Sequence, residues 1–334
     1  MTGRGLSIAT IRDTPTLEAL APAWDALFEA ASASPFQSPA WLLPWVKAFA
    51  AETACAFAAF EGGALVGLCP FFVHRDPEGG ARQLTLAGNG LSDHLDLIAA
   101  PRRREDVADA LAAWIDEVAA WDRLDFRDVP AGSPLLTLPL PVARERIEPE
   151  EPCPVTALPA RAEAVVALLD KKRRYDLRRG VRTLGDRGEA SFEVARDEPA
   201  RAAVLASLVD LHQRRWALRG EAGVFADPAV VDFHAAATRA LLAAGLLRLH
   251  ALKLDGRTIA AHYALAAGPR AYSYLHAFDP EFAACNPGAV LTAHVLEAAV
   301  RDGATAFDFL RGREPYKYRW RAVDQPKHRR RGWK

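Results

Sequence analysis

Eight prolines between residues 129 and 159 are the feature that most constrains how this chain can fold. They stand at positions 130, 134, 139, 141, 149, 152, 154 and 159. Proline has no backbone N–H and a fixed φ, so this segment cannot form a continuous helix or a central strand. The 334 residues of the chain are enough for about two domains of ordinary size. We therefore place a domain boundary in this segment and predict domains over residues 1–155 and 156–334.

The two predicted domains share an order of elements. In the first, helices at 15–31 and 41–49 precede a hairpin through 61–63, two strands, a helix at 105–121 and a strand at 124–126. In the second, helices at 161–186, 200–219 and 228–244 precede a hairpin at 247–267, a strand at 271–278, a helix at 288–302 and a strand at 306–310. This order predicts an α/β fold of the α+β, mixed-sheet kind, built by internal duplication.

The two predicted domains differ in charge. The chain has 42 basic and 42 acidic residues, but residues 1–155 contain 12 basic and 22 acidic ones, a net charge of −10, which leaves +10 for residues 156–334. Seven basic residues gather in 171–182 and ten in 311–334. One interpretation is a solvated helix face and a disordered tail; the other is contact with a phosphate, an anionic acceptor or tRNA. We expect the second domain to bind an anionic ligand.

The sequence excludes several classes of protein. It has no GxSxG, Walker A or GxGxxG motif, which argues against an α/β hydrolase, a P-loop NTPase and a Rossmann dehydrogenase. No recognised nucleic-acid motif is present, so we expect no DNA partner. We expect buried thiols and no metal, because no metal-site spacing relates Cys55, Cys69, Cys153 and Cys285. Without a signal-peptide core or an apolar stretch of about 20 residues, we expect a cytoplasmic protein with no membrane span.

Residues 271–320 carry the most informative pattern. A strand is predicted to end at Phe278, and Asn286-Pro287-Gly288 then opens a helix. Proline fixes φ in the first turn, and glycine has no Cβ to block a close approach. The free N–H groups of such a helix start form a cradle for an anion. A simple helix cap is the other interpretation of the same three residues.

An ordered series of short motifs in this half of the chain resembles a known family. The series is Gly-Arg-Thr-Ile-Ala-Ala (256–261), Tyr-Ser-Tyr-Leu (272–275), Phe-Asp-Pro (278–280), Asn-Pro-Gly (286–288) and Asp-Phe-Leu-Arg-Gly (308–312) with Tyr316-Lys317. It resembles the CelD/BcsL-like acetyltransferases of the GNAT superfamily, which are related to the Fem-type peptidyltransferases. Upstream, the resemblance extends through Arg173, Arg178, Arg179, Arg182, Arg215-Trp216 and Phe225 to Gly67 and Phe36-Gln37-Ser38. One residue departs from it: Cys285 stands where GNAT chains carry Gln or Arg.

The resemblance implies tandem GNAT-like domains, an acidic first one that supports the other or binds the acceptor, and a basic second one that binds acyl-CoA. Acetyl-CoA or another acyl-CoA would lie where the strand ending at Phe278 separates from its neighbour, with its pyrophosphate over Asn286, Gly288 and Ala289. Tyr316 is the first choice for the general acid, ahead of Tyr318. The candidate bases are Asp308, His276 and Glu314, and the candidate substrate-binding residues are Arg178, Arg215, Trp216 and Lys317.

These observations predict an N-acyltransferase that moves an acetyl or acyl group from acyl-CoA to an amine, with a saccharide- or polysaccharide-linked amine as one candidate acceptor. Two alternatives stay open. The Fem-type relatives use aminoacyl-tRNA as donor, so tRNA could replace CoA. The other alternative is a non-catalytic protein with a GNAT scaffold that only binds an anionic polymer.

Overall fold

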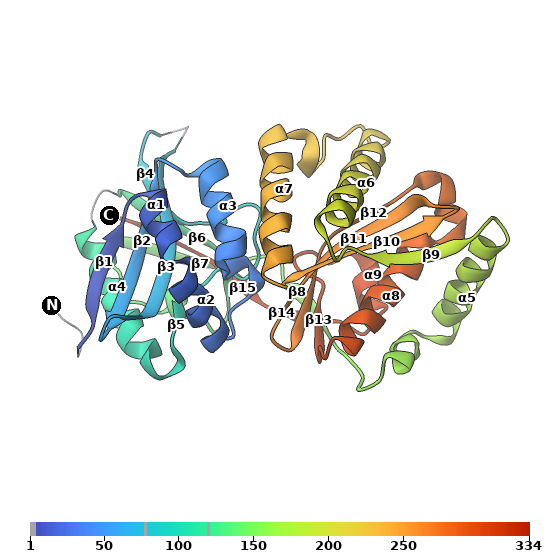
Figure 1. The fold of residues 1–334 in the computed structure, drawn as a ribbon. Helices are drawn as coiled ribbons and strands as arrows, with labels where there is room; N and C mark the ends of the chain where they lie inside the picture. The colour runs from blue at the N-terminus through green and yellow to red at the C-terminus, as the bar shows by residue number, and fades with distance from the viewer. Residues whose placement is uncertain (1–4, 77–78, 119–120) are drawn as a thin grey trace. The chain divides into compact units, whose positions relative to one another are not determined.

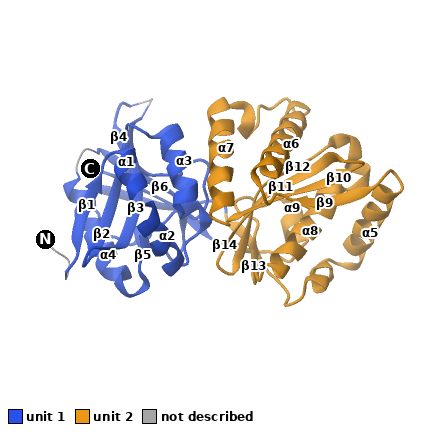
Figure 2. Cartoon of the chain, viewed as in Figure 1, with its two compact units in different colours: residues 1–151, 326–334 blue, residues 152–325 orange. Residues whose placement is uncertain are grey.

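The computed structural model describes residues 5–76, 79–118 and 121–334. The chain forms two compact units, one of residues 1–151 with 326–334 and one of residues 152–325 (Figure 2). Within the described residues, no helix combines the length and the apolar composition that crossing a membrane requires.

Unit 1 is built around one mixed sheet (Figure 1). Its described strands follow the order β1-β2-β3-β4-β6-β15-β7, with β5 paired to β3. The pair β4–β6 is parallel, and the other described pairs of this sheet are antiparallel. The bounds are β1 Ser7–Ile11, β2 Ala54–Glu61, β3 Ala64–Arg75, β4 Arg82–Leu86, β5 Ile98–Ala99, β6 Arg123–Pro130, β7 Arg144–Pro149 and β15 Lys327–Trp333.

The described helices of unit 1 are α1 Thr14–Ala19, α2 Ala21–Ala30, α3 Pro39–Phe49 and α4 Arg104–Glu117. Local capping explains where α3 begins. The Ser38 hydroxyl accepts the N–H of Trp41 at 3.3 Å, and Pro39 stands in the first turn. The core of the unit is aromatic, and the fully buried side chains include Trp24, Trp41, Phe57, Phe71 and Phe126.

Unit 2 has a second mixed sheet in the order β14-β8-β13-β12-β11-β10-β9. The strands are β8 Cys153–Ala157, β9 Ala190–Val194, β10 Leu247–Leu254, β11 Arg257–Ala267, β12 Arg270–Phe278, β13 Ala306–Asp308 and β14 Val323–Gln325. The described helices are α5 Lys171–Gly185, α6 Glu198–Ala217, α7 Pro228–Ala243, α8 Pro287–Arg301 and α9 Pro315–Tyr318. The helix expected at 161–186 is divided, because Asp170 caps α5 by accepting the N–H of Arg173 at 2.8 Å.

Helices cover both faces of the second sheet. Ala260 and Ala264 of β11 pack in one apolar cluster with Leu296 of α8. Tyr263 contacts His234 of α7, with 5.8 Å between ring centroids. Since neighbouring side chains of a strand point to opposite faces, α8 lies on one face and α7 on the other (Figure 1).

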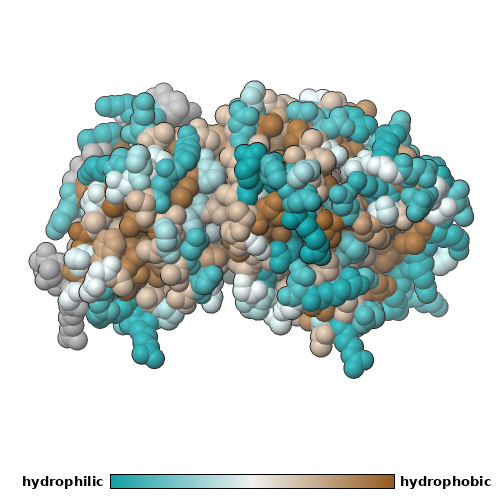
Figure 3. All heavy atoms as spheres, in the orientation of Figure 1, coloured by the Kyte–Doolittle hydropathy of each residue, from teal (hydrophilic) through white to brown (hydrophobic). Residues whose placement is uncertain are grey.

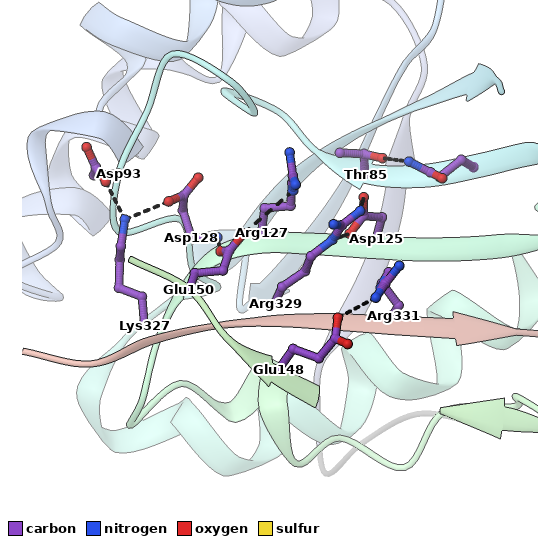
Figure 4. Close-up of polar contacts among 11 residues, drawn as sticks. Thr85, Asp93, Asp125, Arg127, Asp128, Glu148, Glu150, Lys327, Arg329 and Arg331 are labelled. Atoms are coloured by element: carbon purple, nitrogen blue, oxygen red, sulfur yellow. Dashed lines mark hydrogen bonds and ion pairs between the residues drawn. The ribbon is translucent and has the colours of Figure 1, made fainter. Parts of the chain in front are cut away.

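The chain leaves unit 2 before its end, which the sequence did not indicate. Residues 326–334, expected in the second domain or as a disordered tail, instead form β15 between β6 and β7 of unit 1. The expectation of a second-domain or disordered C-terminal segment was wrong, because the basic side chains of this segment pair with acidic side chains of unit 1. Lys327 is bonded to Asp93 and Asp128, and Arg329 binds both carboxylate oxygens of Asp125 at 2.6 Å (Figure 4). The five basic residues of this segment halve the net charge of −10 carried by residues 1–155.

The proline-rich segment also differs from expectation in one strand. Pro154 lies inside β8, which has β13 on one side and β14 on the other. Its carbonyl accepts the N–H of Phe309 at 2.9 Å. A proline is accommodated because β14 is only a three-residue strand and the ladder needs few donors from β8.

Candidate active site

The second sheet opens between β12 and β13. The two strands pair in parallel only over Arg270–Tyr272 and Ala306–Asp308. β12 continues to Phe278, held on its other edge by β11. Among the described strands, β12 therefore has no β13 partner beyond Tyr272, and this edge of the strand can line a site.

The start of α8 lies against the end of β12. Asn286 has a left-handed φ of 53° and precedes Pro287 in the first turn. An added Cβ on Gly288 would lie 3.2 Å from Cδ1 of Phe278, so the glycine allows a close approach. The N–H groups of Ala289 and Val290 both bond to the carbonyl of Asn286, at 3.1 and 3.2 Å. Among the described residues the N–H of Gly288 has no acceptor, as the predicted anion cradle requires.

The basic helix α5 lies beside this helix start. At Gly180 an added Cβ would lie 2.6 Å from the carbonyl oxygen of Cys285, which is the residue before Asn286. Leu177 and Gly180 are buried, and the two residues between them, Arg178 and Arg179, are exposed. Hydrophilic side chains cover the edge of unit 2 where α5 lies (Figure 3). A basic helix therefore packs beside the residue that precedes the N-terminus of α8, and positive charge near such a terminus favours an anion.

Four of the candidate residues lie together at the free edge of β12. The ring of His276 is 5.2 Å from the ring of Tyr316, edge to face. The guanidinium carbon of Arg215, on α6, lies 5.4 Å from the centre of the Phe278 ring. The structure thus brings together residues that are up to 101 positions apart in sequence, with Phe278 as the link to α8.

Burial sets the protonation of the two central groups. Desolvation, followed by the charges of Arg215 and Lys317, lowers the pKa of His276 to about 4. Desolvation, followed by the charge of Glu314, raises the pKa of Tyr316 above its ordinary value. Near neutral pH the imidazole is therefore uncharged and the phenol keeps its proton. One can accept a proton and the other can donate a hydrogen bond.

The other candidates have structural partners. Asp308 is fully buried, and its Oδ1 accepts the N–H of Leu310 at 2.8 Å. Glu314 forms an ion pair with Lys317 at 2.9 Å. The buried Lys317 ammonium also donates to the carbonyls of Leu310, Arg311 and Gly312, at 3.0, 2.6 and 3.1 Å. Lys317, expected to bind substrate, is thus placed to hold the loop before α9.

Trp216 lies on α6 beside Arg219, whose guanidinium carbon is 5.5 Å from the indole, and beside His212. Among the described residues, its ring makes no aromatic contact with Phe278, His276 or Tyr316. The sequence reading missed Gly180, which brings α5 against the α8 start. A glycine in the middle of a predicted helix is the signal that could have found it, because such a glycine often marks a close packing contact.

Comparison with known proteins identifies a domain in the second unit. Residues 171–318 match the family model described as an acetyltransferase (GNAT) domain. The second unit contains a GNAT domain. The predicted resemblance to the CelD/BcsL-like acetyltransferases is thereby confirmed, and the open edge of β12, the α8 cradle and Tyr316 all lie inside the matched residues. No curated protein matches the chain significantly.

Solved structures extend the likeness to the whole chain. FemX covers 96% of this chain and 96% of its own, with 13% identity and a TM-score of 0.67. L-PGS from Bacillus licheniformis covers 92% and 90%, with 12% identity and a TM-score of 0.60. A tandem GNAT protein from the clavulanic acid biosynthesis pathway covers 98% of both chains, with 12% identity and a TM-score of 0.50. At these identities the likeness shows the fold, and the predicted tandem GNAT architecture is confirmed.

Proposed function

We propose that the protein is an N-acyltransferase that uses acyl-CoA as donor and an amine as acceptor. The observation that carries the proposal is the N-terminus of α8, with its glycine against Phe278, at the free edge of β12. The N–H of Gly288 would bind the donor's pyrophosphate, with Ala289 beside it in the first turn, and the basic helix α5 would neutralise the donor's phosphates. The residues present fit such a donor, because among the described residues the N–H of Gly288 has no acceptor and glycine has no Cβ to block a close approach.

The proposed reaction forms a C–N bond and breaks a C–S bond. The amine nitrogen attacks the thioester carbonyl, and the thiol leaves. His276 is the best placed of the candidate bases, because Asp308 and Glu314 are engaged by Leu310 and Lys317. Its neutral ring accepts the proton that the amine loses. Tyr316, as the general acid, gives its phenolic proton to the departing sulfur, so that the donor leaves as a thiol.

The proposal also includes the class of the acceptor. A saccharide- or polysaccharide-linked amine is our candidate, and Arg215 and Arg178 would contact its anionic groups. We propose that unit 1 supports the second unit or binds this acceptor.

A second candidate is aminoacyl transfer from charged tRNA. It is favoured by the full-length likeness to FemX and by the exposed arginines of α5, which suit a phosphate backbone. A GNAT scaffold that binds an anionic polymer without catalysis is the third candidate, and there Tyr316→Phe leaves the biological effect intact.

The test is thermal stabilisation of the full chain by acetyl-CoA, CoA and charged tRNA at low and moderate salt. A ligand at about 100 times its Kd adds roughly 2.7 kcal/mol to the free energy of unfolding, which a melting curve resolves. We expect stabilisation by acetyl-CoA and by CoA. Stabilisation by tRNA alone, lost as salt increases, would replace the proposal with aminoacyl transfer.

A further inference from the structure

Unit 2 contains a cavity at the end of α8 that is remote from Gly288. Its volume is about 240 Å³. The walls come from the first residues of β10 and β12, the last residues of β11, Phe307 of β13 and the C-terminal half of α8. The helical lining starts at Val295, seven residues after Gly288, which is about 10 Å along a helix. The cavity is therefore separate from the candidate donor site.

Small side chains make this space. Much of the wall is alanine or glycine, contributed by Gly245, Ala264, Ala266, Ala267, Gly268, Ala271, Ala298, Ala299 and Ala304. An apolar protein cavity of about 150 Å³ is enough to bind benzene. The present volume therefore takes a compact apolar body of one ring or a branched chain of similar size.

Arg270 supplies a cationic group at this cavity. Its side chain is 32% exposed, and its partner among the described residues is Asp308, at a long 3.4 Å from Nη1. Within the described residues, Nε and Nη2 of Arg270 have no hydrogen-bond partner. Asp308 meanwhile accepts the Leu310 N–H at 2.8 Å. Arg270 therefore retains a planar pair of donors that matches a carboxylate.

The second arginine of the lining, Arg248, is occupied. Its Nε donates to Asp302 at 2.6 Å, and its Nη1 donates to the carbonyls of Gly245 and Leu247 at 2.8 and 2.9 Å. The ion pair with Arg248 offsets the negative charge of Asp302. Arg270 is left as the anion-binding group of the lining.

His250 adds a buried polar atom to the same wall. The residue is 2% exposed, and its Nδ1 has no hydrogen-bond partner among the described residues. A buried polar atom without a partner is rare in a folded protein, and a bound ligand or water is the usual reason. Since burial, followed by the nearby His294, lowers the pKa of His250 to about 3, the ring is neutral and adds no charge to the cavity.

We propose that this cavity binds a small organic carboxylate. The apolar body fills the space lined by alanine and glycine, and the carboxylate pairs with the free donors of Arg270. The proposal is independent of the transferase function, because Asp308, the partner of Arg270, has no role in the proposed reaction and the donor cradle is at the other end of α8.

The probe is 4-fluorobenzoate, followed by ligand-observed fluorine NMR with the full chain. We expect saturable binding to the wild-type protein. Arg270→Gln weakens it at least tenfold, and the neutral isostere 4-fluorobenzyl alcohol binds the wild-type protein at least tenfold more weakly than the acid. Arg301→Gln is the matched control, since Arg301 is an exposed α8 arginine that pairs with Glu297 at 3.1 Å and does not line the cavity. This control leaves the affinity unchanged.

Ala298→Leu tests the apolar half of the site, because the larger side chain fills the cavity. We expect it to weaken 4-fluorobenzoate at least tenfold, while excess CoA does not displace the probe from the wild-type protein. The proposal is overturned by no saturable binding to the wild-type protein, by equal affinity for the acid and the alcohol, by unchanged binding in Ala298→Leu, or by displacement with CoA. The acid and alcohol comparison needs only the wild-type protein, so a variant that fails to fold leaves it decisive.

Discussion

Lys327→Met is the sharpest test of how unit 1 is held together. The Lys327 side chain is 1% exposed, and its ammonium lies between Asp93 and Asp128, which are 3% and 7% exposed (Figure 4). Removing one partner of a buried ion pair costs about 3–5 kcal/mol, because the remaining charge is left desolvated. Here one substitution removes the ammonium from two carboxylates. We expect a loss at the upper end of that range, which lowers the melting temperature of a unit of this size by about 10 °C or more.

Tryptophan fluorescence is a suitable assay, because six of the eight tryptophans lie in unit 1. The matched control is Lys47→Met, which removes an exposed ion pair with Glu18, the two side chains being 58% and 38% exposed. An exposed pair contributes about 1 kcal/mol or less. Adding Asp93→Asn and Asp128→Asn to Lys327→Met restores part of the lost stability. A shift for Lys327→Met no larger than that for Lys47→Met would refute the reasoning.

Two predictions concern unit 2. Tyr316→Phe lowers kcat by about 100-fold or more, because the leaving group loses its proton or hydrogen-bond donor. The KM for acetyl-CoA changes little. Steady-state thiol release measures both constants, and an unchanged kcat would remove Tyr316 from the reaction. His234 and His250 are buried, and desolvation lowers the pKa of each to about 3. The unfolded chain then binds more protons below pH 6.5, so each histidine lowers the free energy of unfolding by about 1.4 kcal/mol per pH unit as the pH falls from 6.5 toward 3. Urea midpoints at pH 7 and pH 5 check this against the double variant His234→Gln, His250→Gln, whose dependence on pH should be weaker.

Local sequence signals located the second sheet well. The hairpin predicted at 247–267 is β10 and β11, and its Asp255-Gly256 turn has two positive φ values, 48° and 78°. Such a turn needs residues that tolerate the left-handed region, and that requirement is visible in the sequence. The Asn-Pro-Gly start of α8 was predictable for the same reason.

The sequence did not predict that the last strand, β15, joins the sheet of unit 1. Lys327 is 234 residues from Asp93 and 199 from Asp128 along the chain. Their pairing depends on the path of β15 between β6 and β7, which no local pattern encodes. The negative net charge of residues 1–155 and the positive net charge of residues 156–334 are consistent with this pairing. The net charges alone do not show which basic segment pairs with which acidic residues.

The candidate site was predictable as a set of residues and not as an arrangement. The resemblance indicated Tyr316, and the predicted positions of His276, Asp308 and Glu314 near it made them the candidate bases. Only the contacts separate them, because Asp308 is fully buried and bonded to a backbone N–H while His276 faces the Tyr316 ring. A buried carboxylate and a site carboxylate look alike in a sequence.

The most direct test of the proposed function is calorimetric titration of acetyl-CoA into the wild-type protein and into Gly288→Val. The valine would crowd Phe278 and occupy the cradle. The control is Gly185→Val at the end of α5, where an added Cβ meets nothing within 4 Å. We predict saturable binding to the wild-type protein and to Gly185→Val, and at least tenfold weaker binding to Gly288→Val. No binding to the wild-type protein, or equal binding to all three, would contradict the assignment of the α8 N-terminus as the acyl-donor site.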